Sequence, residues 1–247
     1  SKWISWCDYI RKEFTPKIQD YKIRQGKINI YHFIIKLFKL LKRNEIIVAA
    51  DGAATVVPNQ VGYLNRNIKY IANAGSASMG FELPGAIGAA IADKKKKIIC
   101  LAGDGSMMLN LQELQTVKSL KLNIIIFLIN NDGYLSIKQT QKNFFGREYG
   151  SSPKSGLTFP DFVKIAKSFG IKSYDLKLKG WKNKLRQIIQ FKGPYFVNIN
   201  VDTKQEFEPK LKSNTVNNKI VTPSLEDMYP FLSKKIKRKI LKKLNDN

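Results

Sequence analysis

Short apolar runs alternate with segments whose apolar residues recur at helical spacing along most of this 247-residue chain. Runs of this length, bounded by small and polar residues, are typical of strands buried on both faces of a parallel sheet. The expected strands cover residues 46–50, 68–72, 98–102, 124–129, 171–176 and 195–201. The expected helices cover residues 30–43, 83–92, 107–120, 160–169 and 181–191, and residues 135–145 form either a polar helix or an ordered loop. This alternation predicts an α/β fold with a doubly wound parallel sheet flanked by helices.

The two ends of the chain do not follow this pattern. Residues 1–26 carry apolar side chains spaced for one face of a helix and are expected to be separate from the sheet. Asn29 is expected to be the N-cap of the helix over residues 30–43. Residues 146–158 are rich in Gly, Ser and Pro, which is typical of a mobile connector. Beyond residue 201 the chain is polar and basic, apart from a small apolar island.

Polar residues follow two of the expected strands at positions that a crossover brings together. Asp104 comes after the strand over residues 98–102, and Asn131 comes after the strand over residues 124–129. A crossover helix brings the carboxyl ends of parallel strands to one edge of the sheet, where ligands bind in open α/β folds. We therefore expect Asp104 and Asn131 to lie side by side. Their oxygen atoms suit Mg²⁺ or Ca²⁺ and are poorly suited to zinc.

The glycines beside Asp104 extend this prediction to a phosphate group. Gly103 and Gly105 remove side chains where a phosphate would approach the backbone. The N–H groups of Ser106 and Met107 are expected to open a helix whose dipole favours an anion. A magnesium–diphosphate is the simplest occupant. The alternative is an ordinary βαβ unit in which Asp-Gly and Asn-Asn-Asp-Gly serve only as turn residues.

Charge and cysteine content narrow the class of protein without identifying it. The formal net charge is +24, but aromatic residues are not interleaved with the basic runs, so we expect a lysine-rich surface and no nucleic-acid partner. Cys7 and Cys100 have the spacing of neither a disulfide framework nor a metal site, which fits a cytoplasmic protein. Because no apolar run is long enough to cross a bilayer and no signal-peptide pattern is present, no membrane partner is expected.

At the sequences GDGS (residues 103–106) and NN (residues 130–131), the chain resembles the thiamine-diphosphate motif. The longer stretches NAGSASMGFELPGAIGAAIA and GDGSMMLNLQEL are similar to the large-subunit group of acetolactate synthases. The resemblance implies that residues 29–203 form the C-terminal, diphosphate-binding domain of such an enzyme. It also implies that residues 1–28 are the end of the preceding middle domain with its linker helix, and that residues 204–247 are a basic tail.

The resemblance assigns roles to individual residues. Asp104 and Asn131 would bind Mg²⁺ through their side chains, and Gly133 through its backbone carbonyl. Met79, which could also be a core methionine at a helix start, would hold the cofactor bent, and the backbone carbonyl of Ala77 would meet the aminopyrimidine. The residues implied to bind the cofactor are Gly52, Ala53, Ala54, Ala77, Met79, Gly103, Asp104, Gly105, Ser106, Asn131 and Gly133.

The activity implied is that of a thiamine-diphosphate- and Mg²⁺-dependent 2-keto acid decarboxylase or carboligase, acting on pyruvate or another 2-keto acid. The family's activating glutamate belongs to a separate pyrimidine-binding domain, on the same full-length chain or on a partner subunit of a homodimer or homotetramer. No acidic residue of this sequence is assigned that role, so the isolated chain is expected to be inactive. FAD, held largely by the middle domain of acetolactate synthases, is not assignable to this chain.

Two departures from the acetolactate synthase pattern affect the expected reaction. Thr140 stands where authentic acetolactate synthases carry a tryptophan that shapes the pocket for the second keto acid, so the acceptor is left open. The sequence PSLEDMYPFL at residues 223–232 is similar to the tail of synthase-like proteins of cell-surface polysaccharide pathways, which implies a role in polysaccharide or sugar modification.

Two alternatives to this enzyme remain. A non-catalytic partner or binding module that retains the fold would explain the absence of the activating glutamate. A Rossmann oxidoreductase is weakly supported, because no expected strand is followed by G-x-G-x-x-G with an acidic residue about 20 positions further on.

Overall fold

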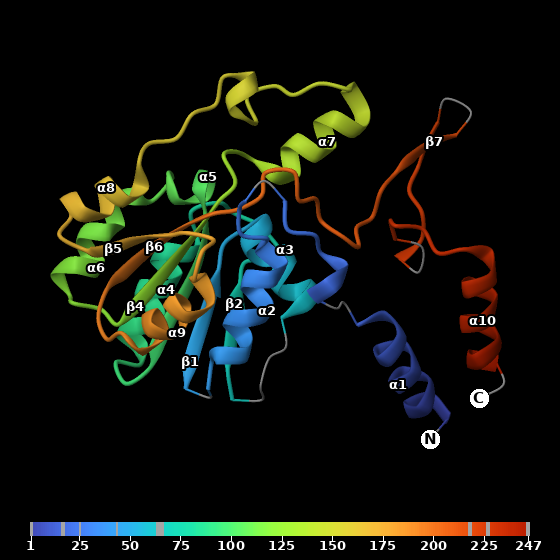
Figure 1. Cartoon of the computed structure of the whole chain (residues 1–247), viewed down its shortest axis with the longest axis horizontal. Coiled ribbons are helices and arrows are strands. Elements are labelled where there is room, and N and C mark those ends of the chain that lie inside the picture. The colour runs from blue at the N-terminus through green and yellow to red at the C-terminus, as the bar shows by residue number, and fades with distance from the viewer. Residues whose placement is uncertain are drawn as a thin grey trace. The chain divides into compact units, whose positions relative to one another are not determined.

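The computed structural model describes residues 2–15, 18–24, 26–42, 44–62, 67–216, 219–225 and 228–245 (Figure 1). The chain divides into two compact units: Tyr21–Glu206 is the larger, and Ser1–Asp20 together with Phe207–Asn247 forms the smaller. The expected end of one helix at Arg43, and two residues of the segment 223–232, lie outside the described residues.

A six-stranded parallel sheet forms the centre of the larger unit, in the order β2-β1-β3-β4-β6-β5. The strands are β1 (Glu45–Ala49), β2 (Lys69–Ala72), β3 (Lys97–Gly103), β4 (Ile124–Asn130), β5 (Lys172–Leu176) and β6 (Tyr195–Asn200). Each apolar run that predicted a strand forms one. The strands β1, β3, β4 and β6 are buried along nearly their whole length, as expected for a sheet covered on both faces. The predicted doubly wound fold is confirmed.

Helices cover both faces of this sheet (Figure 1). On one face lie α2 (Ile30–Leu40), α3 (Ala53–Val61) and α9 (Trp181–Gln190). There the ring of Phe33 packs edge-on against Phe127 of β4, with 5.3 Å between ring centroids. On the other face lie α4 (Glu82–Ala92), α6 (Leu114–Ser119) and α8 (Phe162–Ser168), which share one apolar core with β3 and β4.

The start of α2 is capped as predicted. The side chain of Asn29 accepts a hydrogen bond from the backbone N–H of Tyr31 at 2.9 Å. Its amide also donates to Gln205 Oε1 at 2.7 Å, so the cap ties the helix to the end of the larger unit. An N-cap of this type contributes about 1 kcal/mol. The helix ends at Leu40, earlier than the sequence pattern predicted.

The single helix predicted over residues 107–120 is wrong. The segment is broken into α5 (Asp104–Met107), a 3₁₀ turn η2 (Leu111–Glu113) and α6. The break falls at Asn110, whose backbone leaves the helical region (φ −135°, ψ 30°). Its side chain donates to the backbone oxygen of Gly80 at 2.7 Å, a contact that a continuous helix would not place there.

At the carboxyl end of the sheet, residues 135–145 form the helix α7 (Leu135–Phe145) rather than an ordered loop. The connector after it contains a 3₁₀ turn, η3 (Pro153–Ser155). Its Ser151 is fully buried, and its backbone oxygen accepts a hydrogen bond from the N–H of Tyr134 at 3.0 Å. This part of the connector therefore packs against the segment that follows β4.

The smaller unit contains α1 (Lys2–Phe14), η1 (Ile18–Asp20), the hairpin strands β7 (Asn214–Val216) and β8 (Lys219–Val221), and α10 (Lys234–Asn245). The indole N–H of Trp6 on α1 donates to the backbone oxygen of Ile240 on α10 at 3.4 Å. The basic tail thus holds a hairpin and a helix that the sequence pattern did not predict. Within the described residues, no helix combines the length and the apolar character needed to cross a membrane.

Candidate functional site

The ends of β3 and β4 bring Asp104 and Asn131 together. Gly103 and Ile129 are register partners in the two strands, and Asp104 and Asn131 follow within two residues of them. The carboxylate oxygen Oδ2 of Asp104 accepts a hydrogen bond from the backbone N–H of Asn131 at 3.0 Å. The crossover therefore places the two residues side by side, as its topology predicts.

Asp104 holds the turn after β4 in place. Its Oδ2 also accepts from the N–H of Gly133 at 3.1 Å, and its Oδ1 accepts from the N–H of Gly105 at 2.8 Å. The residue is only 2% exposed. Burial raises the pKa of this carboxyl group to about 7, although the three N–H donors act in the opposite direction.

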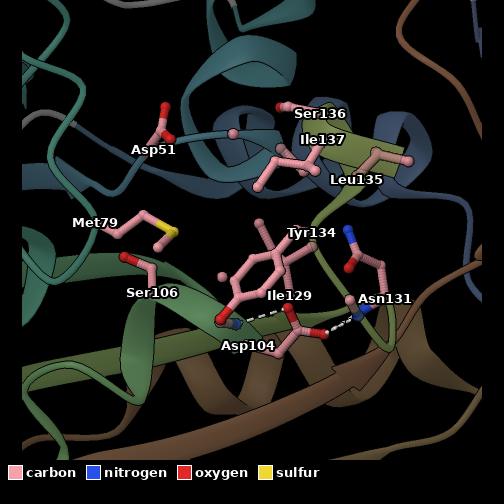
Figure 2. A pocket seen from close by; sticks show the side chains of 15 residues that line it. Asp51, Met79, Asp104, Ser106, Ile129, Asn131, Tyr134, Leu135, Ser136 and Ile137 are labelled. Atoms are coloured by element: carbon pink, nitrogen blue, oxygen red, sulfur yellow. Dashed lines mark hydrogen bonds between the residues drawn. The ribbon is translucent and has the colours of Figure 1, made fainter. Parts of the chain in front are cut away.

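The side chain of Asn131 leaves one polar atom unused. Its Oδ1 atom is buried and has no hydrogen-bond partner among the described residues. A buried oxygen without a partner costs free energy unless a ligand or water meets it. Figure 2 shows this carboxamide directed away from the strands, towards the hollow beneath α7.

The turn after β4 requires Gly133. Its φ is +152°, and a Cβ atom there would overlap the backbone oxygen of Ser151. The preceding Asp132 also has a positive φ, +54°. This backbone geometry turns the chain so that the N–H of Gly133 reaches Asp104.

The turn after β3 carries Ser106 into a network with α4. The Ser106 hydroxyl donates to Glu82 Oε2 at 2.7 Å and accepts from the N–H of Gly80 at 2.7 Å. Gly80 directly follows Met79, so the serine links the turn at the end of β3 to the segment that carries this methionine. The helix that begins there, α5, is a single turn of four residues, so the predicted contribution of a helix dipole is small.

A pocket lies over these residues (Figure 2). Of the residues expected to bind a cofactor, those that line it are Gly52, Ala53, Met79, Gly103, Asp104, Gly105, Ser106, Asn131 and Gly133. Ala54 and Ala77 do not line it. Ala54 is fully buried in α3, whereas Ala77 is exposed in the turn before Met79 and has a φ of +49°.

Other residues complete the wall of the pocket. The pocket-lining residues that no sequence motif identified are Asp51, Ile129, Tyr134, Leu135, Ser136 and Ile137. Asp51 begins the small-residue turn that supplies Gly52, and its position there could have identified it. The other five belong to the end of β4 and the start of α7, directly around Asn131. Their side chains differ in chemistry, so no motif marks them.

Tyr134 occupies the space that Gly105 leaves open. A Cβ atom on Gly105 would lie 2.7 Å from Cδ1 of the tyrosine ring, and closer still to Cε1. The absence of a side chain at Gly105 thus lets the ring lie over the turn after β3. Figure 2 shows the ring near the centre of the pocket, between Ser106 and Asn131.

The fold and this site together define an α/β domain with an oxygen-rich, glycine-lined pocket at the carboxyl edge of a parallel sheet. The family model described as thiamine pyrophosphate enzyme, C-terminal TPP binding domain, matches residues 51–199, and the chain belongs to that family. Thiamine pyrophosphate, also called thiamine diphosphate, is therefore confirmed as the cofactor of its family.

Individual relatives agree with this family assignment. Acetolactate synthase isozyme 1 large subunit from Escherichia coli (strain K12) is 31% identical over 225 residues, covering 90% of this chain and 39% of that protein. The acetolactate synthase large subunit from Cyanidium caldarium is 36% identical over 154 residues, covering 62% of this chain and 26% of that protein. The chain thus spans well under half the length of these relatives, and the resemblance to acetolactate synthase large subunits is confirmed.

Proposed function

We propose that this chain is the cofactor-anchoring part of a thiamine-diphosphate- and Mg²⁺-dependent 2-keto acid decarboxylase or carboligase similar to acetolactate synthase. The observation that carries the proposal is the buried Oδ1 atom of Asn131, which has no partner among the described residues and lies beside Asp104. The family supplies the identity of the cofactor, and this atom supplies a reason to place its metal here.

The donor set of the pocket fits a magnesium ion. Asp104 and Asn131 offer hard oxygen atoms, and Mg²⁺ is usually bound by one or two carboxylates together with water and phosphate oxygens. Within the described residues, no three His, Cys, Asp or Glu side chains form a cluster, so a site of the zinc type is not supported. We assign the metal to the side chains of Asp104 and Asn131 and to the backbone carbonyl of Gly133.

The remaining residues of the pocket would hold the organic part. Gly103, Gly105 and Ser106 would surround the diphosphate. The N–H of Gly105 is already engaged by Asp104, and the ring of Tyr134 takes the space that the missing side chain leaves, so Gly105 would contribute by letting this ring line the pocket. Gly52 and Ala53 would form the facing wall, with Ala54 packed behind them in α3.

Met79 would support the cofactor in its bent form. It is 37% exposed and lines the pocket, which supports this role over that of a core methionine. The backbone carbonyl of Ala77, in the turn just before it, would meet the aminopyrimidine. When bound, the cofactor supplies a nucleophilic carbon and an electron sink for decarboxylation of a 2-keto acid, while the chain's own residues bind and orient it.

The proposal also covers the domain limits of this chain, the domain that would complete the active site, and the substrate. Residues 29–203 would be the diphosphate-binding domain, residues 1–28 the end of a preceding domain, and residues 204–247 a basic tail. A pyrimidine-binding domain, on the same full-length chain or on a partner subunit, would supply the activating glutamate in a cytoplasmic homodimer or homotetramer. The substrate would be pyruvate or another 2-keto acid.

Calorimetric titration of the full-length protein with thiamine diphosphate and Mg²⁺ tests the cofactor assignment. Asp104→Ala and Asn131→Ala should each abolish measurable binding. Asp132→Asn is the matched control, because this neighbouring carboxylate is exposed and does not line the pocket, and asparagine tolerates its positive φ of +54°. Unchanged affinity in the first two variants would overturn the assignment.

Product analysis tests the reaction. The full-length protein would be given pyruvate with a panel of keto acids, aldehydes and keto-sugars. Thr140 lies exposed on α7 one turn beyond Ser136, whose backbone oxygen accepts its hydroxyl at 3.0 Å. Its small side chain, together with the resemblance of residues 223–232 to polysaccharide-pathway proteins, supports an acceptor related to sugars. Dominant formation of 2-acetolactate would refute this choice, and cofactor binding without turnover of any substrate would favour a non-catalytic module.

A further inference from the structure

A buried acid that the proposed chemistry does not use lies beside the diphosphate turn. Glu82 is the first residue of α4 and is 0% exposed. Its Oε2 accepts the hydrogen bond from the Ser106 hydroxyl at 2.7 Å. Its Oε1 has no hydrogen-bond partner among the described residues. A carboxyl group in this position costs free energy, so its presence needs a reason.

The hydroxyl group of Ser106 is fully committed in this arrangement. A serine hydroxyl has one hydrogen to donate. With Glu82 as a carboxylate, that hydrogen goes to Oε2, while Oγ accepts from the N–H of Gly80 at 2.7 Å. Ser106 lines the pocket, yet it then has no hydrogen to offer an anion there.

The surroundings of Glu82 favour its neutral form. Burial raises its pKa to about 7, and the negative charge of Asp51 acts in the same direction. The hydroxyl of Ser106 and the backbone N–H groups of Glu82 and Gly80 lower it less. From β3, the buried thiol of Cys100 donates to the backbone oxygen of Glu82 at 3.6 Å, and burial raises the pKa of that thiol well above its usual value.

We propose that Glu82 is a positioning residue which, when protonated, donates its hydrogen to Ser106 Oγ and so releases the serine hydrogen for an oxygen of the bound diphosphate. The inference rests on the proposed function, because it takes the diphosphate as the occupant of the pocket. The heavy atoms keep their places, since the 2.7 Å separation of Glu82 Oε2 and Ser106 Oγ suits a hydrogen bond in either direction.

This arrangement couples cofactor binding to the uptake of one proton. Above neutral pH, an ionised Glu82 takes back the serine hydrogen and adds a negative charge near the diphosphate, so the affinity falls. Glu82→Gln removes this dependence, because a carboxamide is neutral at every pH and its N–H can donate to Ser106 in the same way as a protonated carboxyl group.

The test measures the Kd for thiamine diphosphate at saturating Mg²⁺, from pH 6 to pH 9, in the full-length wild-type protein and in Glu82→Gln. The quantity compared is the wild-type Kd divided by the Kd of Glu82→Gln, because the effect of titrating the diphosphate itself cancels in this ratio. It should rise above pH 7 by up to about tenfold per pH unit, the limit for linkage to one proton, and level off at the pH where the protein with ionised Glu82 itself binds. Calorimetry in buffers of different ionisation enthalpy should show proton uptake near pH 8 by the wild type in excess of that by Glu82→Gln.

Two further variants separate this role from simple packing. Glu113→Gln is the matched control: Glu113 also accepts a hydroxyl, that of Thr116 at 2.8 Å, but does not line the pocket, so its pH profile should match the wild type. Ser106→Ala should weaken binding more at pH 6 than at pH 9, because only protonated Glu82 releases the serine hydrogen. This comparison also decides the matter if Glu82→Gln fails to fold.

The possible results separate a failure of the role proposed for Glu82 from a failure of the proposed cofactor-binding function. Binding by the wild type with a Kd ratio independent of pH, or an equal cost of Ser106→Ala at both pH values, would overturn the role of Glu82 alone. A wild-type protein that binds no thiamine diphosphate at any pH would overturn both proposals.

Discussion

The backbone N–H of Asn131 donates to Oδ2 of Asp104 at 3.0 Å, although 27 residues separate them in the chain. The same oxygen accepts from Gly133 at 3.1 Å. One buried carboxylate thus fixes the turn after β4 relative to the turn after β3. The two turns that would share a magnesium–diphosphate are held together before any ligand is bound, which reduces the ordering that binding requires.

Asp104→Asn should therefore weaken the fold as well as the site. The carboxamide keeps one oxygen, so at least one of the N–H donors of Gly105, Asn131 and Gly133 faces an NH₂ group and loses its partner. Leaving a buried donor unpaired costs about 1–3 kcal/mol. Urea denaturation of the cofactor-free protein near pH 4 measures this loss, because at neutral pH the substitution would also remove the cost of ionising this buried carboxyl group, whose pKa is raised to about 7. Asp132→Asn, on the exposed neighbour, should change the free energy of unfolding by less than about 0.5 kcal/mol. Equal changes in the free energy of unfolding for the two substitutions would contradict the role of Asp104 in holding the turns after β3 and β4 together.

Gly133→Ala tests the turn that presents Asn131. An alanine Cβ would collide with the backbone oxygen of Ser151, which belongs to the buried part of the connector and cannot move away cheaply. Gly156→Ala is the control, because Gly156 also has a positive φ, +91°, but open space around its Cβ position. Both variants carry backbone strain of about 1–2 kcal/mol, and Gly133→Ala should lose a further amount of about 1–3 kcal/mol from overpacking. Similar denaturation midpoints for the two variants would refute the collision.

A double-mutant cycle can test the packing of Tyr134 over Gly105. Gly105→Ala should displace the ring, because its Cβ would approach Cδ1 to 2.7 Å and Cε1 more closely. The cost should be about 1–3 kcal/mol in the wild-type background. It should be smaller when Tyr134→Ala has already removed the ring, with a coupling energy of about 0.5–3 kcal/mol. Additive effects, measured by thermal or urea denaturation, would show that the ring does not depend on this glycine.

The strands and the meeting of Asp104 with Asn131 could be predicted because both follow from local patterns. Apolar runs bounded by small residues identify the buried strands, and the geometry of a right-handed crossover then brings the strand ends together. The N-cap at Asn29 was equally predictable, since a capping side chain acts on the first turn of its own helix.

The break at Asn110 could not be predicted in this way. It depends on a hydrogen bond to Gly80, which lies 30 residues away in the chain, and the apolar spacing of residues 107–120 continues through it. Glu82 was missed for a related reason. An acidic residue at the start of a helix is usually solvent-exposed, and only the tertiary structure shows that it is 0% exposed and bonded to Ser106.

Glu82 should also make the stability of the cofactor-free protein depend on pH. Its pKa is raised from 4.5 to about 7 in the folded chain, so the folded state binds the proton more tightly than the unfolded state. Stability is then lost as pH rises from the unfolded to the folded pKa and levels off above the latter. This loss is absent in Glu82→Gln. The free energy of unfolding of the variant, relative to the wild type, should therefore increase between pH 4.5 and 7 and reach a difference of about 3 kcal/mol above pH 7.

Urea denaturation of both proteins at pH 5, 6, 7 and 8 measures this gain. Asp104 also has a raised pKa, but its contribution is present in both proteins and cancels in the difference. If the difference between Glu82→Gln and the wild type did not change with pH, the carboxyl group of Glu82 would not titrate between pH 5 and 8. The buried acid beside Ser106 would then contribute a fixed hydrogen bond rather than a proton-dependent one.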